Sequence, residues 1–560
     1  MTGAPQVEPT DATGAALPEA PTAPTTDDVA PAAATATAAA RADTGGLARA
    51  AGINSLGNVA SRVLGVLRES VISSSFGATG ATSAFDAISA VPRMVYELLV
   101  GGMLSAALVP VLSEYAADDD DDRHGELEDV LSILLSLAGA VLLAVTVFLA
   151  VAAPWVAPLL VGGFDDELLA TATMLLRLIV PAILIYGISG ILQAYHYARK
   201  AFVYPAMGGG AHNLGVIIAV ILLARRFDIY SLSLGIVAAS FCQLAMQIPG
   251  MRGVRLRLRL DWRHPVVRRI LILYAPVVVS IVIQNVGIII DRNLASRTSL
   301  EAITWMNKAT FLIQLPLGLV SMAISLAVLP TLSQIDATRE LDAFKRTFTR
   351  GLRLVLVVII PAAAGLFVLG RPLIELIFEH GVFTAADTVQ SWRALRIYLI
   401  GLPFAAIDLP LIFSFYAQKN TRTPVIVGII AVSIYLVVGP TLAFVFDWGF
   451  LGLVAANAVQ LTSHALIMLV VFSRKFEGLG GYGLERTTLQ AVAAAVAVAL
   501  VGFASHRLLA PYIPPSLIGR AALAGIPAGL AAGAYLAAAR LLRIQEWELF
   551  WGMLARRLGR

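Results

Sequence analysis

The chain is poor in cysteine and in charge. Its 560 residues include one cysteine, Cys242, and Asp, Glu, Lys and Arg together make up only 14% of the sequence. A single cysteine permits no intrachain disulfide and does not make a metal site alone. The sequence has no Walker A run, no paired metal motif and no nucleophile elbow, which argues against an ATP motor and against hydrolase chemistry. We therefore predict a chain without a bound cofactor and without enzymatic activity.

The amino-terminal segment lacks the features of a signal peptide. It is rich in Ala, Pro and Thr and holds no Lys or Arg before Arg41, whereas a signal peptide needs a basic start and an apolar stretch. Its apolar content is too low for a packed core. We predict that residues 1–44 form a disordered cytoplasmic tail.

What the sequence does contain is apolar runs long enough to cross a bilayer. Hydrophobic residues make up 58% of the chain, which indicates an all-α polytopic membrane protein. About fourteen transmembrane helices are predicted. They lie near residues 48–74, 82–113, 127–159, 167–195, 203–224, 230–250, 270–290, 301–333, 352–370, 386–416, 424–446, 449–473, 487–508 and 518–541.

The basic residues gather on the loops of one side. Seven arginines lie between residues 252 and 269, after the sixth span, and another basic group lies at 339–350, after the eighth. The loops after the first, third and eleventh spans hold no Lys or Arg. The positive-inside rule then predicts that both termini are cytoplasmic, with Arg225 and Arg226 as the main exceptions. This distribution explains the net charge of +4 without a nucleic-acid partner.

The end of the chain has an amphipathic pattern. Trp547, Phe550, Trp551 and Leu554 fall on one helical face, and arginines close the segment. Such a helix typically lies in the plane of the membrane surface. We predict an interfacial amphipathic helix at residues 543–560.

The sequence contains an internal repeat. The run from Leu99 to Ser113 matches residues 319–333 at an offset of 220, and Tyr197–Lys200 matches residues 416–419 at an offset of 219. The offset covers six spans, an even number, so both halves keep one orientation and form a parallel repeat. The predicted domains are an N-terminal six-helix lobe, a C-terminal six-helix lobe and two additional helices, at residues 45–260, 261–480 and 481–542.

Two arginines lie in the first span. A charge inside a bilayer costs about 2.5–3.5 kcal/mol on insertion scales, so it usually faces a cavity or a partner. Arg62 and Arg68 therefore suggest the binding of an anion within the membrane. Glu69 lies seven residues after Arg62 and can share its helical face. The alternative interpretation is that Glu69 and snorkelling neutralise the two arginines without any ligand.

Further charges lie in other spans. Arg93 and Glu97 have the spacing of an intrahelical pair. Asp291 ends an apolar run in the seventh span, and Lys308 enters the eighth. Asp408 lies deep in the tenth span, where a carboxyl group must be protonated, paired or bound to a cation. We treat Arg62, Arg68, Arg93 and Lys308 as substrate-binding candidates, and Glu69, Glu97, Asp291 and Asp408 as cavity or ion-coupling candidates.

These motifs resemble those of the MurJ/MviN lipid II flippases, a family of the multidrug/oligosaccharidyl-lipid/polysaccharide exporter (MOP) superfamily. The resemblance covers about residues 48–480. It is carried by Ser61–Gly65 with Arg68, Phe76-Gly77-Ala78, Ala84-Phe85, Pro92, Gly102 to Pro110, Leu315–Gly318, Leu329–Ser333, Gly381–Thr384, and Phe415-Tyr416 to Thr423-Pro424.

The resemblance implies a function and a site. Such proteins move the undecaprenyl-pyrophosphate-linked peptidoglycan precursor, lipid II, from the inner to the outer leaflet of the bacterial cell membrane. Family arginines of the first span line a central cavity and match Arg62 and Arg68. The resemblance also implies that residues 481–542 form a groove for the lipid tail. Guanidinium groups suit pyrophosphate because they donate two parallel hydrogen bonds.

The sequence departs from the family at several positions. Ser83 replaces a family acid, and Tyr96 and Phe311 replace arginines of some members. We hypothesise that Arg93 and Lys308 compensate from one turn away. Asp291 matches the acid with which some members bind sodium, but residues 424–446 hold no Asp or Asn. That absence argues against a sodium site, and coupling to Na⁺ or H⁺ stays an open alternative.

Three other functions remain open at this point. The first is a flippase for another polyprenyl-linked glycan. The second is a multidrug/cation antiporter of the same superfamily, a class that favours cavity acids over arginines and typically has twelve spans. The third is a non-transporting scaffold for cell-wall assembly. The expected partners are the lipid-linked precursor, membrane lipids and cell-wall synthesis proteins.

Overall fold

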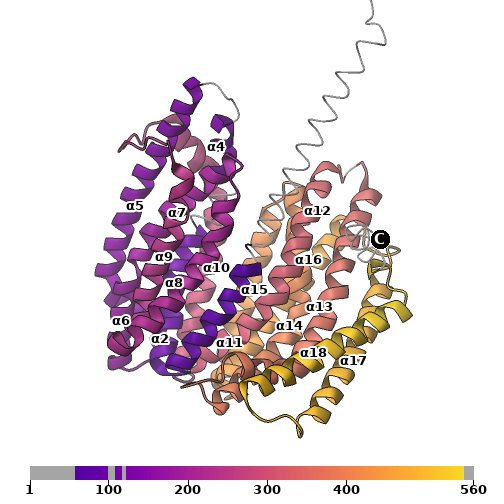
Figure 1. Cartoon of the computed structure of the whole chain (residues 1–560). Helices are drawn as coiled ribbons and strands as arrows, with labels where there is room; N and C mark the ends of the chain where they lie inside the picture. The colour runs from indigo at the N-terminus through magenta and orange to yellow at the C-terminus, as the bar shows by residue number, and fades with distance from the viewer. Residues whose placement is uncertain (1–56, 58, 99–107, 117–120, 338, 548–560) are drawn as a thin grey trace, which may run out of the picture. The chain divides into compact units, whose positions relative to one another are not determined.

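The computed structural model describes residues 57, 59–98, 108–116, 121–337 and 339–547. All regular structure in these residues is helical (Figure 1), as predicted. The predicted tail at 1–44 and residues 548–560 of the predicted amphipathic helix lie outside the described part of the chain.

The first half begins with a helical segment at residues 59–76. It continues through α2 (Gly80–Ile88), α3 (Ala90–Tyr96), α4 (Val109–Ala116), α5 (Asp121–Val161), α6 (Asp166–Ile179), α7 (Pro181–Ala198), α8 (Val203–Phe227) and α9 (Tyr230–Ala245), and then the short η3 (Ile248–Met251). Side chains start two of these helices, because Thr79 and Asp165 accept backbone N–H groups of α2 and α6. Pro181 separates α6 from α7 inside one predicted span, since proline removes a helical donor.

The second half has a similar series of helices. It comprises α10 (Pro265–Ser296), α11 (Ala302–Pro316), η4 (Leu317–Ser321), α12 (Met322–Gln334), α13 (Leu341–Ile377), α14 (Ala385–Ala417), α15 (Arg422–Pro440), η5 (Thr441–Val445) and α16 (Phe450–Lys475). The helices α17 (Leu484–Leu509) and α18 (Leu517–Leu541) follow, and both pack against α13. Figure 1 shows them in yellow.

Eleven helical segments of the described chain are long and apolar enough to cross a membrane. They correspond to the third to sixth and the eighth to fourteenth predicted spans. The first predicted span falls on the helical segment 59–76, and the seventh falls on α10. The second is described in two parts, since residues 99–107 lie outside the described chain.

A buried apolar cluster joins the two halves. Phe85 and Ile88 of α2 belong to the same cluster as Ile303 of α11 and Leu395 of α14. Burial of such side chains stabilises a fold within a protein interior mainly through close packing. The charged groups described below therefore lie beside a packed contact between the halves.

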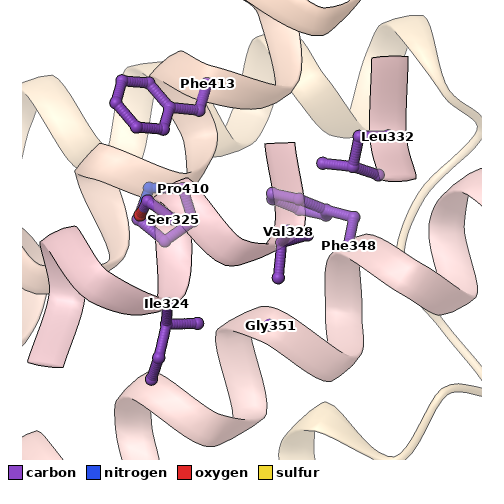
Figure 2. A pocket seen from close by; sticks show the side chains of 8 residues that line it. All are labelled: Ile324, Ser325, Val328, Leu332, Phe348, Gly351, Pro410 and Phe413. Atoms are coloured by element: carbon purple, nitrogen blue, oxygen red, sulfur yellow. The ribbon is translucent and has the colours of Figure 1, made fainter. Parts of the chain in front are cut away.

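A small cavity lies between α12, α13 and α14 of the second half. Figure 2 shows its lining, which is apolar except for Ser325. Gly351 and Pro410 contribute to the lining from α13 and α14. The volume of about 10 Å³ is that of a single water molecule. This cavity is far too small for a lipid head group.

Candidate substrate site

Glu69 connects the two halves of the chain. One of its carboxylate oxygens lies 2.7 Å from Arg68 Nη2, and the other lies 2.8 Å from Lys308 Nζ on α11. The Lys308 side chain is only 2% exposed and the Glu69 side chain 17%. The spacing of seven residues allows Glu69 to share a helical face with Arg62, but its ion-pair partners are Arg68 and Lys308.

Neighbouring helices hold this group in place. Arg68 Nη1 donates to Oδ1 of Asn213 on α8 at 3.0 Å. The amide of Asn213 in turn donates to the carbonyl oxygen of Ser61, the residue before Arg62, at 2.8 Å. Lys308 Nζ lies 5.4 Å from the ring centre of Phe378, an additional favourable contact for a buried ammonium. Asn213 thus links the Arg68 guanidinium to the backbone of the first span.

Arg62 has a different environment. No side-chain hydrogen bond or ion pair joins it to another described residue. Its guanidinium lies against Gly318 of η4, where a β-carbon would be 2.9 Å from Nη2. Gly318 therefore makes room for Arg62 at the contact between the halves. Of the two first-span arginines, Arg62 makes no side-chain hydrogen bond to a described residue, whereas both terminal nitrogens of Arg68 are bonded and only its Nε lacks a partner among the described residues.

Two further charged residues, Asp86 and Arg292, lie near Arg68, Glu69 and Lys308, and we call these five residues the charged cluster. Asp86 of α2 lies within electrostatic range of Lys308 and of Arg292 on α10. Arg292 Nη2 donates to Oδ1 of Asn307 at 2.5 Å. Three cations, Arg68, Arg292 and Lys308, thus accompany two carboxylates, Glu69 and Asp86. A third carboxylate, Asp291, interacts electrostatically with Arg292.

Two arginine nitrogens that lack an acceptor among the described residues suggest an anionic ligand. The Nε atoms of Arg68 and Arg292 are buried and bond to no protein acceptor among the described residues. Buried polar groups normally have a partner, so each such donor needs an explanation. An oxygen-rich anion would supply acceptors for both.

Arg93 and Glu97 form the intrahelical pair that their spacing predicts. Arg93 Nε lies 3.9 Å from Glu97 Oε1, and the two side chains are 61% and 55% exposed. Arg93 is near enough to interact electrostatically with Arg292, Arg68 and Asp86. An exposed pair of this kind is weak, so Arg93 is readily available to a ligand.

The two other candidate acids have partners in the second half. Tyr435 of α15 donates its hydroxyl to Asp291 Oδ1 at 2.5 Å. His464 Nδ1 of α16 lies 2.7 Å from Asp408 Oδ1. Asp408 is therefore paired, one of the three states that its burial required. Asp291 interacts electrostatically with Arg292, whereas Asp408 bonds to His464 away from Glu69, so the structure does not bring all eight candidates together.

A backbone contact also joins the halves, at the ends predicted to face outward. The Val382 N–H donates to the Ser74 carbonyl oxygen at 3.0 Å. Gly77 and Gly381 have φ angles of +64° and +58°, and a β-carbon on Gly381 would lie 2.1 Å from the Ser74 oxygen. Both glycines belong to motifs noted in the sequence, and this close approach gives a physical reason for them. Thr384 of the second motif caps α14.

The whole chain was then compared with known proteins. The profile of a family described as "Lipid II flippase MurJ" matches residues 72–522. The chain belongs to the MurJ family. This result confirms the resemblance inferred from the motifs.

Individual members of the MurJ family are similar over most of their length. The lipid II flippase MurJ of Burkholderia cenocepacia is 30% identical over 383 residues, which are 66% of this chain and 73% of that relative. A probable lipid II flippase MurJ of Vibrio cholerae is 28% identical over 444 residues, covering 77% of this chain and 83% of the relative.

Solved structures show the same fold. A lipid II flippase MurJ in an inward closed conformation superposes with a TM-score of 0.70 at 21% identity, over 90% of this chain and 99% of the other. An inward-facing multidrug resistance MATE transporter of the MOP superfamily has a TM-score of 0.64 at 10% identity, over 76% and 96% of the two chains. The chain is therefore a polytopic membrane protein with the MOP superfamily fold.

The sequence pattern did not indicate Asp86 of the charged cluster or Thr304, nor the partners of Asp291 and Asp408. Neither Asp86 nor Thr304 was predicted from the sequence. Thr304 lies 221 residues after its hydrogen-bond partner Ser83, and this separation is close to the repeat offset of 220. Tyr435 and His464 were missed because a tyrosine or histidine in an apolar span is usually structural. The repeat could have pointed to Thr304, because Thr304 and Ser83 are separated by nearly the repeat offset. For Tyr435 and His464 the only available signal was that a buried acid, Asp291 or Asp408, needs a partner on a facing helix.

Proposed function

We propose that this chain moves lipid II from the inner to the outer leaflet by alternating access, as a transporter and not as an enzyme. The observation that carries this proposal is the group of basic side chains at the contact between the halves of a MurJ-family fold, where Arg62 makes no side-chain hydrogen bond or ion pair with another described residue. Its relatives are named as lipid II flippases, and the pyrophosphate of that lipid is an anion for which guanidinium groups are suited.

The two available arginines make the first contact in this proposal. Arg62 and Arg93 offer donors that no strong protein partner occupies, so they bind the pyrophosphate as it enters. Arg68 is held by Asn213 and Glu69. A pyrophosphate beside Arg68 brings negative charge next to Glu69, where it repels the carboxylate and attracts Lys308, and this weakens the Glu69–Lys308 ion pair. Lys308, a substrate-binding candidate by sequence, then acts mainly as the partner of Glu69.

Alternating access requires that the contacts between the two halves on one side of the protein break. In the present state the halves are joined by the Glu69–Lys308 ion pair, by Ser83 with Thr304 at 3.1 Å, and by the Ser74–Val382 backbone contact. We propose that these contacts close the outward side. Anion binding at Arg68 lowers the cost of separating Glu69 from Lys308, and the outward side then opens. A ligand shifts such an equilibrium only by its differential affinity for the two states.

The lipid tail need not enter the cluster. Helices α17 and α18 expose apolar side chains such as Leu500 and Phe503, which suits a surface in contact with hydrocarbon. We propose that the polyprenyl chain lies along these helices, at residues 481–542, while the head group crosses between the halves. The hydrophobic part of the substrate then remains in an apolar environment throughout.

The membrane potential is the proposed driving force. With the inside negative, each negative charge that moves outward gains about 2.3 kcal/mol per 100 mV. A sodium ion at Asp291 has less support, because the Asp291 carboxylate already accepts the Tyr435 hydroxyl. Coupling to a proton through Asp408 and His464 is the alternative that this pair leaves open.

The proposed location is the bacterial cell membrane, with both termini in the cytoplasm. The basic loops support this orientation, and the partners proposed are the lipid-linked precursor and the surrounding lipids. Contacts with cell-wall synthesis proteins remain a prediction from the family resemblance.

Complementation tests the proposed function. Bacteria depleted of their own lipid II flippase should regain growth and outer-leaflet exposure of lipid II when they express this chain. Rescue of a strain that lacks a flippase for another polyprenyl-linked glycan serves as the comparison. Accumulation of the chain in the membrane without lipid II exposure would refute the substrate assignment, and rescue of the comparison strain alone would favour the other glycan.

A further inference from the structure

A second basic site lies away from the central cluster, where α13 begins, α17 begins and α18 ends. It is a surface cavity of about 800 Å³. Five arginines line it: Arg346, Arg350, Arg353, Arg486 and Arg543. Two carboxylates, Asp342 and Glu546, lie in the same lining.

Two of the five arginines hold the cavity together. Arg353 pairs with Glu546 and donates to the carbonyl oxygen of Tyr482 at 3.1 Å. Arg346 pairs with Asp342 at 2.5 Å, and Asp342 also accepts the Tyr482 hydroxyl at 2.6 Å. These contacts fasten the loop before α17 and the end of α18 onto α13. They also use both carboxylates.

The other three arginines are not neutralised. Arg350, Arg486 and Arg543 are exposed, and no side-chain hydrogen bond or ion pair joins them to another described residue. They come from three different elements and face one cavity with a net formal charge of +3. Like charges repel, so such a convergence is unfavourable unless an anion offsets it.

The glycine loop opens the rim of this cavity. Gly481 and Gly483 have φ angles of +87° and +74°, in the left-handed region that favours glycine. A β-carbon on Gly483 would lie 3.4 Å from Arg353 Nη1. The loop therefore passes close to Arg353, and its one bulky side chain, Tyr482, bonds to Asp342.

An apolar surface leads away from the cavity. Leu489, Val496, Leu500 and Phe503 follow Arg486 on one face of α17, at spacings of three, seven, four and three residues. All four are exposed, Leu489 at 71% and Leu500 at 63%. This arrangement, a phosphate-binding head above a hydrocarbon-facing stripe, matches a lipid better than a free ion.

We propose that this cavity binds the phosphate head group of an anionic phospholipid of the cytoplasmic leaflet, with an acyl chain along α17. The bound lipid joins α17 and α18 to α13 by neutralising the three arginines. The head-group site lies outside the Glu69 cluster, and its acyl chain shares the apolar face of α17 with the polyprenyl chain of the proposed substrate.

Lipid binding to the detergent-purified full chain tests this proposal. Native mass spectrometry measures the affinity for phosphatidylglycerol in the parent, in R350Q/R486Q/R543Q, and in the control R252Q/R255Q/R268Q, which removes three exposed arginines from another basic segment. Charge-assisted contacts of this kind predict at least about tenfold weaker binding in the first variant and no change in the control. The single variant R486Q should weaken binding by about fivefold, which keeps the test valid if the triple variant unfolds.

Two competitors define the ligand class. Phosphatidylcholine, which has no net charge, should bind the parent much more weakly than phosphatidylglycerol. Inorganic phosphate at the same concentration should not displace phosphatidylglycerol, because it lacks the acyl contact. Equal phosphatidylglycerol affinity in the site variant and the control would overturn the proposal. Displacement by phosphate would overturn the choice of a lipid and indicate a site for a free anion.

Discussion

At the scale of single residues, two kinds of cation lie at the contact between the halves. Some are paired with protein carboxylates, and others have donors available to a ligand. Arg68 and Lys308 share Glu69, whereas Arg62 lies beside Gly318 without a polar partner. The sequence predicted the Arg93–Glu97 pair because four residues along one helix fix their distance. It did not predict the partner of Glu69, because Lys308 is 239 residues away and only the packing of the two halves brings them together.

The Glu69–Lys308 pair should be important for stability. Breaking a buried ion pair leaves an uncompensated charge, so K308M should lower the free energy of unfolding in detergent by about 3 kcal/mol or more. In the double variant E69Q/K308M the loss should be smaller than the sum of the two single losses. The exposed pair Arg371–Glu375 is the matched control, and R371M should cost less than about 1 kcal/mol. Additive effects in the cycle would contradict a direct Glu69–Lys308 interaction.

The ion pair should also affect transport. In the proposed mechanism Glu69 must leave Lys308 for the outward side to open, so E69Q should shift the protein toward the opened state. Accessibility of cysteines introduced near the contact, measured with a thiol reagent after the C242S substitution, should rise. An unchanged accessibility in E69Q would show that this pair does not help to close the outward side.

At the scale of elements, the hydrophobic pattern predicted the spans better than their interruptions. The predicted span 301–333 is divided by a π-helical turn at η4, after Pro316, and the predicted span 167–195 has a break before Pro181. Hydropathy reports only that a segment is apolar, so it does not distinguish a straight helix from two joined ones. The turns matter for the site, since η4 places Gly318 against Arg62.

The glycine contact between the halves leads to a prediction. G381A places a methyl group against the Ser74 carbonyl oxygen and strains a backbone with φ +58°. Left-handed backbone costs an L-residue about 1–2 kcal/mol, so the closed contact should be at least about fivefold less populated. Disulfide cross-linking between cysteines at Ser74 and Val382, in a C242S background, measures this population.

Gly253 provides the control for that substitution. It has φ +88°, and a β-carbon there would meet no atom within 4 Å. G253A should therefore strain the backbone and leave the cross-linking yield unchanged. An equal yield in the parent and G381A would show that the Ser74–Val382 contact does not need glycine.

At the scale of the whole molecule, the repeat relates the two halves. Ser83 and Thr304 are 221 residues apart and hydrogen-bonded to each other. A contact between nearly equivalent positions is expected close to the axis of a parallel repeat, which supports the interpretation of the offset of about 220 residues. The family and the membrane class followed from sequence motifs, but the charge balance of the cluster required contacts among five separate elements.

The direction of transport should depend on the membrane potential. In proteoliposomes with an imposed potential of about 100 mV, two negative charges moving toward the positive side gain roughly 4.6 kcal/mol, less what moving arginines cancel. Lipid II transfer toward the positive side should therefore be faster than transfer without a potential. Replacing sodium by choline should leave the rate within about twofold, because residues 424–446 hold no Asp or Asn that could complete a sodium site with Asp291. A potential-independent rate that requires sodium would contradict this account.

The central claim is that arginines of the first span carry the pyrophosphate across. The most direct measurement is the rate of lipid II translocation by purified protein in proteoliposomes, for the parent, R62A, R68A and the control R371A. We predict rates at least about tenfold lower for R62A and R68A, since each loses a charge-assisted contact of about 1.5–3 kcal/mol, and a parental rate for R371A. Parental rates for both R62A and R68A, with the variants folded and inserted, would contradict the claim.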